Sequence, residues 1–169
     1  KERLVLCHGC FDLLHLGHIR HLQEARAFGD RLIVSVTADR HVQKGIGRPH
    51  FSENERVEAL KALDCVDDAF ICQFGTGAEV IEAVRPAVYC KGIDYADQVA
   101  TNPFTQAEVA AVTAYGGEFH ITKAQKYSSS RLLNAQRLSK DAAEYLAGVG
   151  DKGWMSDIED AMIKADELT

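Results

Sequence analysis

Apolar residues in this chain of 169 residues fall into short blocks that follow two different periods. Five compact apolar runs predict buried strands, at about residues 3–7, 31–37, 68–73, 87–90 and 118–121. The segments between them repeat apolar residues at helical spacing and predict helices, at about residues 17–28, 53–63, 77–84 and 104–114. Strands that alternate with helices predict an α/β fold, in which a doubly wound parallel five-stranded sheet has helices on both faces.

The turn between the first predicted strand and the first predicted helix carries several reactive and small residues. Residues 8–18 read His-Gly-Cys-Phe-Asp-Leu-Leu-His-Leu-Gly-His, and we call this segment the signature loop. A strand-to-helix turn directs backbone N–H groups and a helix N-terminus at one point, which suits a phosphate. His15 and His18 add N–H donors that can follow charge onto a phosphoryl group in a transition state. The sequence therefore predicts a phosphate site at the carboxyl ends of the strands.

Charge and hydropathy narrow the classes of function. The formal net charge of −6 argues against non-specific binding of nucleic acid, which needs a basic surface. A hydrophobic content of 46% is enough for a sizeable core. No apolar run approaches the roughly 20 residues of a membrane helix, and no signal peptide is evident. We expect a cytoplasmic protein without nucleic-acid or membrane partners.

The cysteines and histidines leave two metal or redox alternatives open. The five cysteines are odd in number and irregularly spaced, which suits reduced thiols. Cys7 and Cys10 form a C-x-x-C pair, but a zinc or redox module would need a second ligand pair or a thioredoxin context. His15, His18 and His21 could share a metal, yet no cysteine or carboxylate at suitable spacing completes that set. We therefore predict no metal ion held by the protein alone.

The pattern Gly-x-Phe-Asp-x-x-His-x-Gly-His at residues 9–18 resembles the signature of the nucleotidyltransferase superfamily that includes cytidylyltransferases and adenylyltransferases. Within it, the chain is most similar to the adenylyltransferase domain of heptose-phosphate (ADP-heptose) synthases, and next to glycerol-3-phosphate cytidylyltransferase. The resemblance runs from about Leu4 to Asn134, with matching segments at 29–36, 44–49, 55–67, 91–95 and 128–131. It implies a Rossmann-like sheet and an enzyme that transfers a nucleoside monophosphate from an NTP to a phosphorylated acceptor.

The resemblance also implies four catalytic residues. His15 and His18 would donate hydrogen bonds to the triphosphate, and Lys44 would bridge the α-phosphate and the acceptor phosphate. Arg56 would contact the acceptor or the nucleotide phosphate. The simpler alternatives are histidines that only cap or cover the helix at positions 15 and 18, a solvated loop lysine at position 44, and at Arg56 a surface salt bridge with Glu53 or Asp39.

Further residues are implied for binding. The nucleotide would contact Gly9, Cys10, Phe11, Asp12, Gly17, Lys91, Gly92, Asp94, Tyr95, Ser128, Ser129 and Ser130. Asp12 would order the signature loop or touch the metal-bound nucleotide; Asp94 would bind ribose or shape a turn; the serines would bind phosphate or cap a helix. Lys123 stands where many relatives have an arginine, which keeps a charge for the substrate but loses the bidentate fork. Mg²⁺ is expected with the NTP, held largely by phosphate oxygens and water.

The resemblance favours ATP over CTP and a sugar- or polyol-phosphate acceptor. A CTP-dependent enzyme of the glycerol-3-phosphate type is the alternative within this class, and an inactive nucleotide-binding regulatory domain is the alternative outside it. We predict a nucleotidyltransferase domain at 1–134 and a helical extension or linker at 135–169. By the same resemblance we expect a homodimer. We also expect this chain to be one domain of a longer protein that carries a sugar kinase as well.

Overall fold

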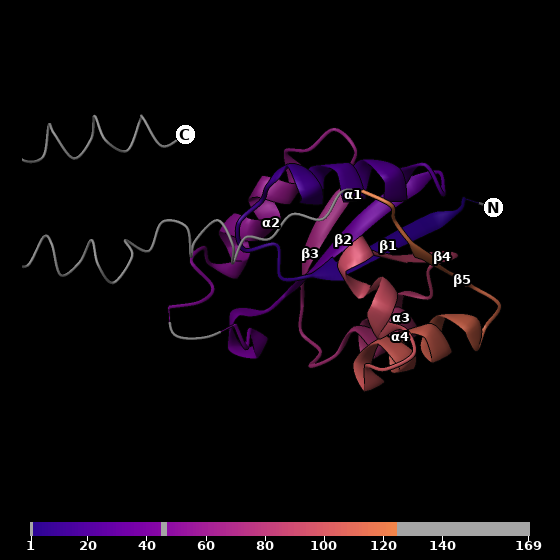
Figure 1. Cartoon of the computed structure of the whole chain (residues 1–169). Helices are drawn as coiled ribbons and strands as arrows, with labels where there is room; N and C mark the ends of the chain where they lie inside the picture. The colour runs from indigo at the N-terminus through magenta and orange to yellow at the C-terminus, as the bar shows by residue number, and fades with distance from the viewer. Residues whose placement is uncertain (1, 45–46, 125–169) are drawn as a thin grey trace, which may run out of the picture. The chain divides into compact units, whose positions relative to one another are not determined.

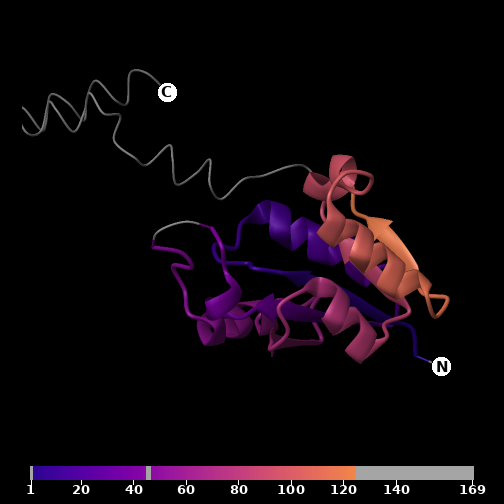
Figure 2. The ribbon, with the colours of Figure 1, turned by 90° about the horizontal axis from the view of Figure 1, so that it is seen from below.

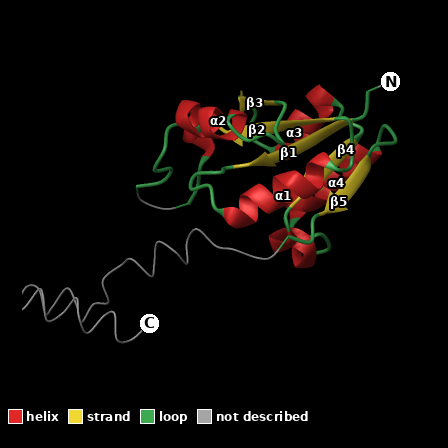
Figure 3. Ribbon diagram, turned by 90° about the horizontal axis from the view of Figure 1, so that it is seen from above, coloured by secondary structure: helices red, strands yellow, loops and turns green. Residues whose placement is uncertain are grey.

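The computed structural model describes residues 2–44 and 47–124, and its centre is a parallel sheet of five strands in the order β3-β2-β1-β4-β5 (Figure 1). The strands are β1 (Leu4–Gly9), β2 (Arg31–Thr37), β3 (Asp68–Cys72), β4 (Val88–Lys91) and β5 (Glu118–Ile121). β1 is the central strand and pairs with β2 and β4 (Figure 3). This confirms the parallel five-stranded sheet that the apolar blocks predict.

In the described part of the chain, four α-helices cover the sheet, two on each face: α1 (Leu16–Arg26), α2 (Glu53–Lys61), α3 (Gly77–Val84) and α4 (Pro103–Thr113). Side chains alternate along β1, so Val5 and Cys7 pack with α1 and α2, while Leu6 packs with α3 and α4. Each face therefore has its own apolar core. Figure 1 shows the two helical layers on opposite sides of the strands.

Local capping explains where the helices begin. Ser52 and Glu55 form a reciprocal capping box before α2, and Thr76 and Glu79 form another before α3. Asn102 caps α4, whose first residue is a proline. The four helices lie within two residues of the predicted bounds, because capping residues and apolar periodicity agree in this part of the chain.

Two short 3-10 helices were not predicted: η1 (Asp39–His41) after β2 and η2 (Ile93–Gln98) after β4. Both follow the carboxyl end of a strand. The segment between β2 and α2 extends outward from the sheet (Figure 2). The predicted helical extension at 135–169 lies outside the described residues. None of the helices within the described part of the chain is long and apolar enough to cross a membrane.

Candidate active site

A cavity of about 450 Å³ opens beside the carboxyl ends of β1 and β4. The strand order reverses there, because the chain runs from β1 to β2 and β3 on one side and adds β4 and β5 on the other. Parallel sheets bind ligands at this topological switch point. The cavity is lined by His8, Gly9, Cys10, Phe11, His18, His21, Lys44, Lys91, Gly92, Asp94, Tyr95, Gln98 and Asn102.

The signature loop has a constrained backbone. Phe11 adopts a φ of 50°, in the left-handed region that bulky residues rarely occupy. Its ring covers Gly9, where a β-carbon would lie 3.0 Å from the nearest ring carbon. The same ring meets the His18 ring edge-on, with centroids 5.4 Å apart. Glycine at position 9 thus allows the loop to close, and strain of this kind is typical of functional sites.

His15 and His18 act as one structural unit at the start of α1. His15 is the N-cap, and its Nδ1 accepts a 3.4 Å hydrogen bond from the backbone N–H of His18. Their rings stack with centroids 3.8 Å apart. Burial, followed by the nearby charges of His15, His21 and Lys44, lowers the pKa of His18 to about 3. Burial also lowers the pKa of His15. Both lowered pKa values favour the neutral imidazole at pH 7, and a neutral ring carries one N–H donor.

Two lysines supply positive charge to the cavity. Lys44 lies on the segment after η1, whereas Lys91 ends β4 and its side chain is only 7% exposed. The Lys91 ammonium lies 2.5 Å from a carboxylate oxygen of Glu108 and 4.1 Å from the centroid of the Tyr95 ring. Asp94 is the one carboxylate on the cavity wall among the described residues. Because Glu108 shares the charge of Lys91, Lys44 is the other source of positive charge for an anionic ligand on this wall.

Asp12 ties the signature loop to the segment before α2. Its carboxylate accepts hydrogen bonds from the backbone N–H groups of His50 (2.7 Å) and Phe51 (3.1 Å) and from Arg48 Nε (2.5 Å). Burial opposes ionisation of Asp12, but the backbone donors and Arg48 outweigh it and lower the pKa of this carboxyl. These contacts match the expectation that Asp12 orders the loop, and its oxygens are engaged by protein donors.

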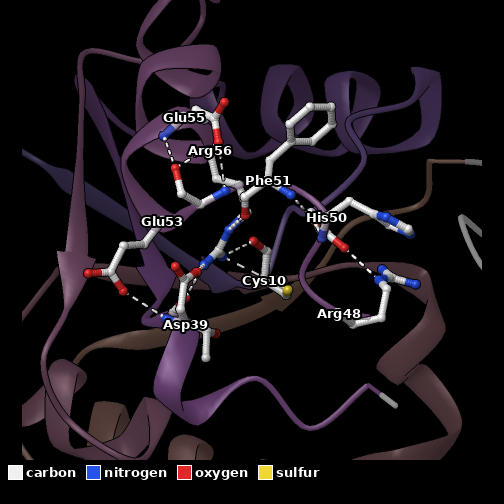
Figure 4. A network of polar contacts seen from close by, with 11 residues as sticks. Cys10, Asp39, Arg48, His50, Phe51, Glu53, Glu55 and Arg56 are labelled. Atoms are coloured by element: carbon white, nitrogen blue, oxygen red, sulfur yellow. Dashed lines mark hydrogen bonds and ion pairs between the residues drawn. The ribbon is translucent and has the colours of Figure 1, made fainter. Parts of the chain in front are cut away.

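Arg56 is buried beneath the loop, 2% exposed (Figure 4). Its guanidinium donates to the carbonyls of Cys10 (2.6 Å), Thr37 (2.8 Å) and Phe51 (3.0 Å), and to an Asp39 carboxylate oxygen (2.6 Å). The ion pair with Asp39 is the alternative that the sequence left open, although here the arginine is buried rather than on the surface. Its Nε and both of its terminal nitrogens thus donate to acceptors within the protein.

The predicted site residues other than His15, Asp12 and Arg56 divide into four groups. Nine line the cavity: Gly9, Cys10, Phe11, His18, Lys44, Lys91, Gly92, Asp94 and Tyr95. Gly17 is buried inside the first turn of α1. Lys123 follows β5, and its backbone N–H donates to the Glu24 carboxylate at 2.9 and 3.0 Å. Ser128, Ser129 and Ser130 lie outside the described residues.

Sequence reasoning gave no binding role to several residues that the cavity includes. His8, His21, Gln98 and Asn102 line it, and Glu108 stands behind Lys91. His8 stands next to Gly9 at the end of a predicted strand, and this position alone could have indicated that it lies at the ligand site. Gln98 and Asn102 line the cavity because of the path taken by η2 and the loop after it. The spacing of apolar residues does not predict that path.

Cys7 and Cys90 are register partners on β1 and β4, and Cys10 lies apart from them in the signature loop. Cys7 is fully buried in the apolar core, and burial, with a further effect from Cys90, raises the pKa of its thiol. Cys10 lines the cavity instead. Across residues 2–44 and 47–124, no group of three or more histidine, cysteine, aspartate or glutamate side chains has an arrangement that could hold a metal ion. The geometry of this region gives no support to a zinc module.

Comparison with known proteins agrees with the geometry. The bifunctional protein HldE of Koribacter versatilis is 52% identical over 135 residues, which cover 78% of this chain and 26% of that protein. The HldE protein of Pseudomonas syringae is 42% identical over 136 residues, covering 79% and 27%. The chain thus spans about a quarter of the length of these curated relatives.

Solved structures are similar as well. A lipopolysaccharide core biosynthesis protein from Thermoplasma volcanium aligns with a TM-score of 0.59 and 30% identity, covering 76% of this chain and all of that one. Pantothenate synthetase from Thermus thermophilus aligns with a TM-score of 0.51 at 17% identity, covering 72% and 55%, which shows a shared fold alone. The model of the family described as cytidylyltransferase-like matches residues 6–135, and the chain belongs to that family.

Proposed function

We propose that this chain is a nucleotidyltransferase that transfers a nucleoside monophosphate from an NTP to a sugar-phosphate or polyol-phosphate and releases pyrophosphate. One observation carries the proposal. The strained signature loop, two lysines and His18, whose ring stacks on that of His15, meet at one cavity at the switch point of the sheet. Such a site binds and polarises phosphates, and family membership gives the same reaction class.

The chemistry needs no nucleophile from the protein. An oxygen of the acceptor phosphate attacks the α-phosphorus; the new P–O bond forms as the bond to the pyrophosphate leaving group breaks. Catalysis is then positioning and electrostatic stabilisation. His15 and His18 donate hydrogen bonds to phosphoryl oxygens as neutral imidazoles, and Lys44 neutralises charge between the α-phosphate and the acceptor phosphate.

The roles of Asp12 and Arg56 differ from those of the cavity residues. Both hold the signature loop against the segment before α2, through Arg48 and the Cys10 carbonyl respectively. They also line a second, largely apolar cavity of about 360 Å³ beside the loop. We propose that they set the shape of the loop and act on the substrate only through it.

Mg²⁺ fits this site as an ion that arrives with the NTP. The described cavity residues offer it one carboxylate, Asp94, together with many donors to phosphate. Mg²⁺ keeps several waters and prefers phosphate oxygens with one or two carboxylates, so this donor set is compatible with it. The ion would neutralise charge on the triphosphate.

The resemblance of the segment at residues 91–95 to that of adenylyltransferases of heptose-phosphate synthases favours ATP as donor and a sugar phosphate as acceptor. We further propose that Ser128, Ser129 and Ser130 bind the outer phosphates and that Lys123 contributes charge near the substrate. The expected homodimer and the expected sugar-kinase domain in the full protein remain predictions, as does a cytoplasmic location.

Pyrophosphate release is the experiment that tests the proposal. The chain would be incubated with Mg²⁺ and with ATP or CTP, each paired with a panel of sugar 1-phosphates and polyol phosphates. Release with one donor–acceptor pair supports the proposal and identifies both substrates. A chain that binds nucleotide but releases no pyrophosphate with any pair would support the inactive binding domain instead.

A further inference from the structure

A row of polar side chains crosses the sheet at the cavity. Ser35 on β2 and His8 on β1 are register partners, and Lys91 on β4 lies one position beyond the Cys7–Cys90 pair. By the alternation of side chains, all three face the layer of α3 and α4, where Glu108 pairs with Lys91. Strands of a parallel sheet that is covered on both faces are usually apolar. A polar side chain there costs free energy unless it forms hydrogen bonds, so a row of three points to a binding role.

His8 is the member of this row with capacity for a ligand. Its Nδ1 lies 2.6 Å from the hydroxyl oxygen of Ser35, which is fully buried. Ser35 is its only hydrogen-bond partner among the residues that the structure describes, and the His8 side chain lines the cavity. A ring nitrogen without a protein partner is satisfied by water or by a ligand. The hydrogen bond to Ser35 occupies Nδ1, which leaves Nε2 of this cavity-lining histidine for such a partner.

We propose that His8 binds the phosphates of the bound nucleotide through Nε2–H, with Ser35 as the positioning residue that holds this tautomer. The inference rests on the proposed function, since it takes the cavity to be the nucleotide site. It adds to that function a contact residue outside the histidine pair and lysines of the expected site. The Ser35 hydroxyl donates to Nδ1, so the single proton of the neutral ring stays on Nε2.

The surroundings explain why the ring stays neutral. Burial, and then the positive charge of Lys91, lowers the pKa of His8 to about 4. A neutral donor suits a site that already holds two lysines, because a third cation next to Lys91 would be repelled. A donor fixed before the ligand arrives also loses no rotamer freedom on binding.

Side-chain nitrogen NMR of the whole chain tests the tautomer directly. His8 signals would be identified by their loss in His8→Gln. In the wild type, we expect Nε2 protonated and Nδ1 unprotonated at pH 7, and a shift of the Nε2–H signal on adding Mg²⁺ with a non-hydrolysable ATP or CTP analogue. In Ser35→Ala, the signals should move toward a mixture of the two tautomers. A protonated Nδ1 in the wild type would overturn the inference.

Affinity for the same analogue, measured by calorimetry, gives the second test. His8→Leu should weaken binding about tenfold, the effect of one lost hydrogen bond to a charged group. His8→Gln, whose amide can place an N–H near the same position, should recover most of the affinity. His120→Leu is the matched control, because His120 lies on β5, contacts Glu118 and is not part of the cavity wall. Wild-type affinity in a folded His8→Leu protein would refute the contact.

These tests do not depend on turnover. If the His8 effects appear while the wild type releases no pyrophosphate with any acceptor, the inference stands and the proposed catalysis fails. Pyrophosphate release by the wild type, together with unchanged affinity in His8→Leu and an unchanged His8 tautomer in Ser35→Ala, would refute the inference but leave the proposed catalysis intact. A wild-type chain that binds neither analogue overturns both.

Discussion

The Lys91 ammonium lies 2.5 Å from the Glu108 carboxylate, in an ion pair that joins the end of β4 to α4. Both side chains are nearly buried, and the Tyr89 hydroxyl donates a 3.0 Å hydrogen bond to the same carboxylate. An ion without a partner in the interior destabilises a protein by several kcal/mol. Glu108 thus allows a charged lysine to stand at the wall of the cavity.

Removal of Glu108 should therefore destabilise the fold. Glu108→Ala leaves Lys91 buried without its partner, and we expect the free energy of unfolding to fall by about 3 kcal/mol in urea titrations. Glu82→Ala, at an exposed position of α3, should change it by less than about 0.5 kcal/mol. The double variant Lys91→Met/Glu108→Leu should recover much of the loss. Equal stability of Glu108→Ala and wild type would contradict a charged, buried pair.

Gly77 should not tolerate a side chain, because the Glu108 carboxylate is fixed next to it. A β-carbon at this first position of α3 would collide with the Glu108 carboxylate, which Lys91 and Tyr89 hold in place. Gly77→Ala should cost about 1–3 kcal/mol of stability despite the better helix propensity of alanine. Gly75→Ala is the control, since its β-carbon would meet only a Glu79 oxygen at 3.9 Å. Thermal unfolding of both variants would show whether Glu108 can move aside.

Arg56→Lys separates a structural role from phosphate binding. A lysine keeps the charge but cannot reproduce the fork that reaches Cys10, Thr37 and Asp39. We expect the free energy of unfolding to drop by about 3 kcal/mol, whereas Arg20→Lys, at an exposed position, should be neutral. Unchanged stability together with a raised KM for either substrate would show that Arg56 binds phosphate after all.

These contacts also mark what the sequence could predict. Strand and helix positions followed from apolar periodicity and capping residues, which are local properties. The partners of Arg56 come from three separate segments of the chain. The burial of Glu108 depends on how α4 packs against β4. The spacing of residues along the sequence predicts neither of these long-range contacts. The signature loop stood out because its histidines and glycines are close in the chain. Lys91 was found through the family pattern, but its ion pair was not.

The buried histidines predict a pH-dependent stability. Burial is the largest cause that lowers the pKa of His8 and His21 to about 4 and that of His18 to about 3, below the ordinary value of 6.5. The unfolded chain therefore binds more protons than the folded one at mildly acidic pH. Stability should be complete above pH 6.5 and decline as the pH falls toward 4, each histidine contributing up to about 1.4 kcal/mol per pH unit.

Urea unfolding between pH 7 and pH 4.5 measures this dependence. His21→Asn removes one titrating ring, which is otherwise bonded to Thr122 at 2.7 Å, and should flatten the slope. Constant stability across this range would mean that the histidines are solvated rather than buried.

The most direct test of the central claim follows a label on the α-phosphate of the NTP. With Mg²⁺ and the correct acceptor, the label should pass into the acceptor product in equal amount to the pyrophosphate released. His18→Ala should lose this transfer by at least a hundredfold while retaining the wild-type melting temperature, and His120→Ala should retain it. Label that stays in the NTP with every acceptor, or transfer that survives in His18→Ala, would contradict the account.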